Sequence, residues 1–278
     1  MRSPQPRKQF AQHWLRSEKA LSKIVKSALL SPSDCLLEIG PGTGILTTQL
    51  LSVARSVVAV EIDRDLSQNL VKRFGNRDNF LLLEGDILTL DIPGQLQGFP
   101  NFQNPNKVVA NIPYNITGPI VEQLLGTISE PNPHPYELIV LLVQKEVAQR
   151  ITANAGSKTF GALSVRVQYL AKCEYICDVP AKAFYPAPKV DSAVLRLSPR
   201  PIAHPATSPQ YLETLLKLGF SSKRKMLRNN LQSVISRDQL TQLLEQLEIN
   251  PQVRAEDLSV EQWVNLANLM EITDLVTD

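Results

Sequence analysis

The sequence has little of what disulfide-bonded, membrane-spanning or secreted proteins need. It holds only three cysteines in 278 residues, which cannot form a disulfide framework and favour a reducing compartment. Its longest strongly apolar run is Leu138 to Val143, whereas a membrane-spanning helix needs roughly 20 such residues. The basic N-terminus carries no apolar run of the kind found in secretory signals. These absences predict a cytoplasmic protein with no membrane partner.

The net charge of +2 hides an uneven distribution. Residues 1–30 hold seven basic side chains and one acid, and residues 217–228 hold five basic side chains and no acid. Residues 237–278 hold nine acids and two basic side chains. Such segregation favours two basic surfaces that face a polyanion, with ordinary solvated helix charge as the alternative. Charge alone does not decide between the two.

In the first 200 residues, short apolar runs alternate with helical patterns. Strands are predicted at 35–39, 57–62, 80–83, 107–110, 138–143 and 193–197. Helices are predicted between them at 47–54, 64–74 and 118–125. This alternation predicts right-handed βαβ units and a parallel, doubly wound α/β sheet.

A proline-rich stretch, residues 198–209, contains four prolines and is typical of a linker. Every segment beyond it has a helical pattern: 211–218, 224–234, 237–247 and 260–274. The sequence therefore predicts an α/β domain over 1–200 and a small helical domain over 210–278.

The first predicted strand leads through Gly40-Pro41-Gly42-Thr43-Gly44 into a helix. Glycines at alternate positions let the backbone turn sharply and approach a ligand closely. The spacing differs from the Gly-x-Gly-x-x-Gly of dinucleotide binders, and no phosphate-binding Gly-Lys-Ser/Thr follows. Nicotinamide and nucleoside-triphosphate sites are therefore disfavoured.

Carboxylates lie at the ends of the next two predicted strands. Glu61, about twenty residues after the glycine turn, is placed to accept two ribose hydroxyls, and Asp86 to accept from an adenine amine. Ligands of parallel sheets lie beyond the carboxyl ends of the strands. The pattern predicts a nucleoside site without a phosphate clamp, as S-adenosylmethionine requires, with surface loop carboxylates as the alternative.

The fourth predicted strand ends in Asn111-Ile112-Pro113-Tyr114. The amide oxygen of Asn111 and a backbone carbonyl can accept both hydrogens of an exocyclic base amine, and Tyr114 offers a face for an unstacked base. Holding the amine in this way aims its lone pair at a methyl group, which is positioning rather than general-base catalysis.

These segments, with four others, resemble the ribosomal RNA adenine dimethyltransferase family, most closely the branch that modifies small-subunit ribosomal RNA. The resemblance covers nearly the whole chain. The further matching segments are Gln12 to Leu15, Gln144 to Arg150, Phe184 to Ser192 and Arg224 to Leu231.

The resemblance implies a Rossmann-like class I methyltransferase fold with a small C-terminal all-helical RNA-binding domain. It implies that the basic segment 1–30 closes over S-adenosylmethionine. The cofactor-binding residues it suggests are His13, Leu15, Gly40, Gly42, Glu61, Asp86 and Asn111. The catalytic residues it suggests are Asn111, Ile112, Pro113, Tyr114 and Phe184, with the two aromatics on either side of the target adenine.

The activity implied is N6-dimethylation of two adjacent adenines near the 3′ end of small-subunit (16S) ribosomal RNA, within a pre-30S-type particle. Basic residues expected on RNA phosphates are Arg7, Lys8, Lys189, Lys223, Arg224, Lys225 and Arg228. No metal site is expected, because Cys173 and Cys177 lack a second cysteine or histidine pair.

Two alternatives remain open. One is the large-subunit (23S) branch, whose methylation confers macrolide resistance. Pro41-Gly42-Thr43, Asp191 and the segment Arg224 to Leu231 speak against it. The other is a mainly non-catalytic small-subunit assembly factor. The complete set of cofactor residues speaks against binding alone.

Overall fold

The structure, a computed structural model, describes residues 5–7, 10 and 12–277. The described chain forms two compact units. The first comprises residues up to 124, 133–148 and 173–199, and the second comprises 125–132, 149–172 and 200 onward.

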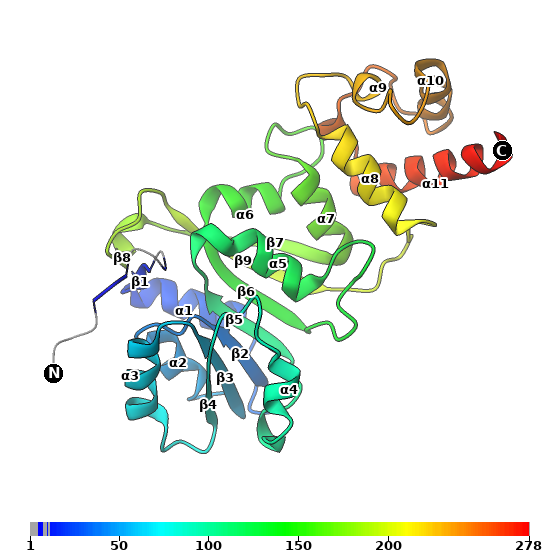
Figure 1. The fold of residues 1–278 in the computed structure, drawn as a ribbon. Coiled ribbons are helices and arrows are strands. Elements are labelled where there is room, and N and C mark those ends of the chain that lie inside the picture. The colour runs from blue at the N-terminus through cyan, green and yellow to red at the C-terminus, as the bar shows by residue number, and fades with distance from the viewer. Residues whose placement is uncertain (1–4, 8–9, 11, 278) are drawn as a thin grey trace. The chain divides into compact units, whose positions relative to one another are not determined.

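A seven-stranded sheet forms the centre of the first unit (Figure 1). The strand order is β4-β3-β2-β5-β6-β9-β7. Neighbours from β4 to β6 are parallel, whereas β9 is antiparallel to β6. The bounds are β2 Cys35–Ile39, β3 Ser56–Glu61, β4 Phe80–Glu84, β5 Lys107–Asn111, β6 Leu138–Gln144, β7 Ala171–Val179 and β9 Ser192–Pro199. This mostly parallel sheet confirms the predicted α/β fold.

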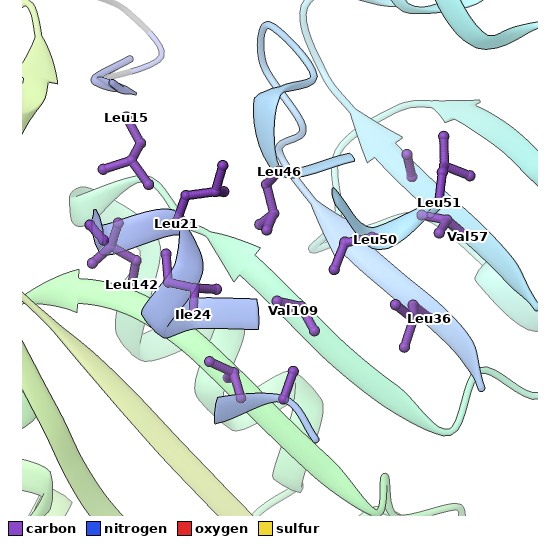
Figure 2. Close-up of a cluster of buried hydrophobic side chains, with 14 of the residues drawn as sticks. Leu15, Leu21, Ile24, Leu36, Leu46, Leu50, Leu51, Val57, Val109 and Leu142 are labelled. Carbon is purple, nitrogen blue, oxygen red and sulfur yellow. The ribbon is translucent and has the colours of Figure 1, made fainter. Parts of the chain in front are cut away.

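Helices cover both faces of the sheet. The helices of this unit are α1 Glu18–Ser27, α2 Ile45–Leu50, α3 Arg64–Phe74, α4 Ile92–Leu96 and α5 Thr117–Leu125, and α6 Lys145–Ile151 begins in it. On one face, leucines and isoleucines of α1 and α2 pack on β-branched and leucine side chains of the central strands (Figure 2). On the other face, Leu37 lies with side chains of α4 and α5 around a second cavity.

The order of the strands places a topological switch point between β2 and β5. From β2 the chain moves outward to β3 and β4, then returns to β5 on the other side of β2. The carboxyl ends of these strands lie level, because Ile39 pairs with Val60 and Glu61 with Glu84. Ligands of open α/β sheets bind at such a point, so the fold itself selects this edge.

The second unit is built mainly from helices. They are α7 Ala162–Leu170, α8 Pro209–Gly219, α9 Leu227–Asn230, α10 Arg237–Gln246 and α11 Val260–Thr277. The expected long helix over 224–234 is wrong, since only α9 forms there. Residues 223–225 lie in a turn instead. The side-chain NH₂ of Asn230 donates to the backbone carbonyls of Gly219 and Ser222, and these bonds keep the preceding residues out of the helix.

Gly219 sits against the largest buried side chain of this unit. A Cβ added there would lie 2.4 Å from Cη2 of Trp263, which has no exposed surface. Gly219→Ala is therefore expected to destabilise the protein by about 1–3 kcal/mol through overpacking. Gly118→Ala is the control, because Gly118 lies in α5 with open space around it and is expected to lose no stability. Urea unfolding followed by tryptophan fluorescence would measure both, and equal midpoints would contradict the packing argument.

Across the residues that the structure describes, no helix is long and apolar enough to cross a membrane.

Candidate functional site

The glycine turn after β2 holds Glu61 in place. The backbone φ angles of Gly40, Gly42 and Gly44 are all positive, at 64°, 58° and 78°. Residues that carry a Cβ adopt such angles only with strain. This path lets the N–H of Gly42 donate to Oε2 of Glu61 at 3.0 Å, while the N–H of Asp63 donates to Oε1 at 3.0 Å. Both N–H donors favour the charged form of Glu61, but burial has the larger effect and raises its pKa.

An open cavity of about 250 Å³ lies at this edge of the sheet. Glu61 and Asp86 line it from β3 and from the loop after β4. The apolar side chains Ile62, Ile87 and Leu88 also line it. Carboxylates between apolar walls suit a nucleoside, whose hydroxyls and amine need acceptors and whose ring needs apolar contact.

The segment 111–114 lines the same cavity. Asn111 ends β5, and Ile112, Pro113 and Tyr114 follow it. The side-chain NH₂ of Asn111 donates to the backbone carbonyl of His13 at 3.2 Å, which directs its amide oxygen away from that contact. Tyr114 is held by a hydrogen bond of 2.5 Å between its hydroxyl and that of Ser192. Both predicted substrate-positioning side chains therefore have fixed orientations.

The N-terminal segment lies over this edge. Strands β1 (Trp14–Leu15) and β8 (Phe184–Tyr185) form a two-stranded antiparallel sheet. His13 stacks on Tyr114 with ring centroids 5.6 Å apart, and its Nδ1 donates to the carbonyl of Pro186 at 2.7 Å. Gln12 donates to Asp63 at 3.0 Å. Contacts from three separate parts of the chain therefore close the segment against the cavity.

Two predicted residues do not line this cavity. Leu15 and Phe184 are opposite each other in the β1–β8 pair and are 4% exposed, packed into the hydrophobic core. Leu15 does line a small adjacent cavity of about 30 Å³ under the glycine turn. The stacking role of Phe184 stays a prediction.

Sequence reasoning missed Glu38, the most unusual residue of the site. It is 1% exposed near the carboxyl end of β2, and no hydrogen bond of good geometry reaches either of its carboxyl oxygens from the described residues. The hydroxyl of nearby Thr47 and the indole N–H of Trp14 are also buried and unpartnered there. Burial raises the pKa of Glu38 to about 8 and the charge of Glu61 adds to the increase, although the side chain and backbone of nearby Thr47 partly oppose it. The signal was visible in the sequence, as an acid inside an apolar strand.

The small cavity brings Glu38 and Trp14 together with the glycine turn. An unpartnered carboxyl accepts from an ammonium group, and an indole N–H donates to a carboxylate. The amino-acid end of S-adenosylmethionine carries both groups, while Glu61 and Asp86 suit its nucleoside end. The residues at this edge of the sheet therefore suit both ends of S-adenosylmethionine.

The expected RNA-binding residues are in different situations. Arg7 is paired with Asp63, at 3.3 Å, and with Asp65, so it fastens the N-terminal segment to the start of α3. Lys8 lies outside the described residues. Lys189 is exposed in the loop before β9, Lys223 to Lys225 are exposed in the turn before α9, and Arg228 is half-buried on α9.

Within the described residues, no group of three histidine, cysteine, aspartate or glutamate side chains could hold a metal ion.

Comparison with known family models and with curated proteins points to one family. The family model described as ribosomal RNA adenine dimethylase matches residues 4–271. A protein of Nostoc punctiforme named ribosomal RNA small subunit methyltransferase A is 69% identical, over 96% of each chain. A protein of the same name from Synechocystis is 57% identical, over 95% of this chain and 96% of its own.

Two solved structures share the fold over most of the chain. A dimethyladenosine transferase from Plasmodium falciparum gives a TM-score of 0.75 at 27% identity, over 94% of this chain and 98% of its own. The 23S rRNA methyltransferase ErmE gives 0.72 at 28% identity, over 93% and 99%. The predicted class I methyltransferase fold is therefore confirmed.

Proposed function

This chain belongs to the ribosomal RNA adenine dimethylase family, and from that premise we propose that it dimethylates N6 of two adjacent adenines near the 3′ end of small-subunit ribosomal RNA. The reaction takes place in the cytoplasm, on a pre-30S-type particle. The observation that carries the proposal is that Asn111 and Tyr114 line the same cavity as Glu61 and Asp86. A base amine and a methyl donor can meet there.

The methyl donor of the enzyme is S-adenosylmethionine, which supplies an electrophilic methyl group when bound. Glu61 would accept from its ribose hydroxyls and Asp86 from its adenine amine. Glu38 and the indole of Trp14 would hold its amino-acid end. The β1–β8 pair would keep the N-terminal segment over the glycine turn, where a Cβ on Gly42 would already touch Trp14 at 3.4 Å.

The target base would be held by segment 111–114. The amide oxygen of Asn111 and the adjacent backbone carbonyl accept the two amine hydrogens, so the nitrogen lone pair faces the methyl group. Tyr114 offers an aromatic face to a base that has left its stack. Burial raises the pKa of Tyr114, so the ring stays a neutral phenol at physiological pH. Phe184 is the proposed second aromatic, and its ring would have to turn out of the core to reach the base.

The choice of small-subunit RNA rests on relatives at 57–69% identity that carry the small-subunit name. The large-subunit methyltransferase ErmE is 28% identical. Mapping the adenines that acquire labelled methyl groups, in both subunits stripped of modification, separates the possibilities. Two adjacent dimethylated adenines in the small subunit are expected. A modified adenine in the large subunit alone would contradict the proposal and indicate a large-subunit methyltransferase. Binding without methylation would indicate an assembly factor.

RNA binding is expected to weaken as salt rises, because lysine and arginine contacts to phosphate release counterions. Replacing Lys223, Arg224 and Lys225 together by alanine should lower the slope of log affinity against log salt by about 2. Arg237→Ala, an exposed cation at the start of α10 outside the basic turn, is the matched control and should leave the slope unchanged. Filter binding across a salt series would measure it, and a triple variant with the wild-type slope would exclude the turn from the RNA interface.

A further inference from the structure

Tyr185 is an exposed aromatic beside the cavity to which the reaction assigns no role. Its relative exposed surface is 42%, whereas its neighbour Phe184 is 4% exposed. Aromatic side chains gain free energy by leaving water, so one that stays exposed next to a binding site is a candidate contact for a ligand.

The β1–β8 pair fixes the direction in which Tyr185 points. Side chains alternate between the two faces of a strand, and directly opposite residues of an antiparallel pair share a face. Leu15 and Phe184 are opposite and face the core, while Trp14 and Tyr185 are opposite and share the other face. Because Trp14 lines the cavity, Tyr185 belongs to the face that continues from the cavity toward solvent.

The ring of Tyr185 is already part of a stack. The guanidinium carbon of Arg16 lies 4.0 Å from the ring centroid. The backbone N–H of Arg16 donates to the carbonyl of Ala183 at 2.7 Å, so its Cα is fixed relative to β8. Arginine planes and tyrosine rings are the two surfaces on which proteins stack unpaired bases. Lys182 and Lys189, exposed on either side of Tyr185 in the sequence, add positive charge for phosphate.

The link to the target base runs through His13. It stacks on Tyr114 and donates to the carbonyl of Pro186, the residue after Tyr185. The ring that faces the target adenine and the Arg16–Tyr185 stack are therefore held in one connected arrangement. A nucleotide that follows or precedes the target along the RNA would reach the stack while the target lies at Asn111.

We propose that Arg16 and Tyr185 form a stacking platform for the base adjacent to the target adenine. The inference rests on the proposed function, because it assumes an RNA substrate with a defined neighbour. The platform holds one adenine of the pair while the other is methylated, so it acts on RNA affinity and on the balance between the two positions.

The test compares Tyr185→Leu with Tyr185→Phe on small ribosomal subunits that lack the two dimethyladenosines. Leucine keeps an apolar side chain in the β1–β8 pair but has no ring face, whereas phenylalanine keeps the face. Tyr185→Leu is expected to weaken RNA affinity about tenfold and to change the ratio of methylation at the two adenines. Tyr185→Phe is expected to stay within twofold of wild type. Phe99→Ala, at an equally exposed aromatic away from the cavity (44%), is the matched control and should change neither.

Cofactor affinity, measured by calorimetry without RNA, should be unchanged in all three variants. A parallel loss of cofactor affinity in Tyr185→Leu would overturn the proposal, since it would place Tyr185 in the support of the N-terminal segment. Equal RNA affinity in Tyr185→Leu and wild type would also overturn it. Neither outcome affects the proposed function as long as the wild-type enzyme methylates the two adenines. A wild-type enzyme that methylates neither adenine would refute the proposed function itself.

Discussion

Replacing Asn111 by alanine is expected to lower the rate of methyl transfer about a thousandfold while cofactor affinity stays within a few-fold of wild type. The amide of Asn111 is oriented by its bond to the carbonyl of His13, so its oxygen is fixed before the base arrives. Alanine removes the acceptor that aims the amine. Glu61 and Asp86, which are proposed to hold the nucleoside end of the cofactor, are untouched by the change.

Single-turnover kinetics with unmethylated small subunits would measure the rate, and calorimetry would measure cofactor binding. Asn69→Ala is the matched control, because that amide is exposed on α3 and, among the residues that the structure describes, donates to the backbone carbonyl of Asp65 in its own helix. Asn111→Ala also removes the contact to His13, so protease sensitivity of the N-terminal segment should be recorded. Dimethylation at the wild-type rate in Asn111→Ala would remove this residue from the mechanism.

The sequence predicted well the features that are set locally. The glycine turn, Glu61, Asp86 and the segment 111–114 all lie at the carboxyl ends of strands β2 to β5, whose ends could be placed within about a residue. In a parallel sheet those ends meet at one edge. The grouping of Gly40, Glu61, Asp86 and Asn111 around one cavity therefore follows from strand ends alone.

Features that depend on distant contacts could not be predicted in this way. The ion pairs of Arg7, one of the residues predicted to contact RNA, are an example, because its partners Asp63 and Asp65 lie more than fifty residues away in the sequence. The turn at 223–225 consists of good helix formers. It stays outside the helix because the buried side-chain amide of Asn230 bonds to backbone carbonyls that precede it. Which aromatic of the pair 184–185 faces solvent depends on the register with β1, which no local pattern gives.

Replacing Glu38 by glutamine is expected to abolish a large pH dependence of stability. The pKa of Glu38 is about 8 in the folded protein against an ordinary value of 4.5, so the folded state binds its proton more tightly than the unfolded state. The free energy of unfolding therefore falls as pH rises from about 4.5 to about 8, by roughly 5 kcal/mol in total. Glutamine has nearly the same shape and no charge, so Glu38→Gln should match wild type near pH 4 and exceed it by that amount at pH 9.

Urea unfolding at pH 5, 7 and 9 measures the difference between the two proteins, in which the titration of other groups largely cancels. Glu84→Gln, at the exposed end of β4, is the control and should unfold in parallel with wild type. If Glu38→Gln and wild type also ran parallel from pH 5 to pH 9, the buried carboxyl would be ionised by contacts other than those described.

The same substitution separates a structural role of Glu38 from a binding role. A carboxyl that is buried, unpartnered and protonated at pH 7 weakens the folded state at higher pH, and natural proteins retain such strain chiefly at functional sites. If Glu38 holds the ammonium group of S-adenosylmethionine, binding at pH 7 must ionise it and release a proton. Calorimetry in buffers of different ionisation enthalpy should then detect proton release in wild type and less in Glu38→Gln, with weaker binding in the variant. Higher stability together with weaker binding is the expected pair of effects, whereas a variant that is more stable and binds equally well would show that Glu38 does not contact the cofactor.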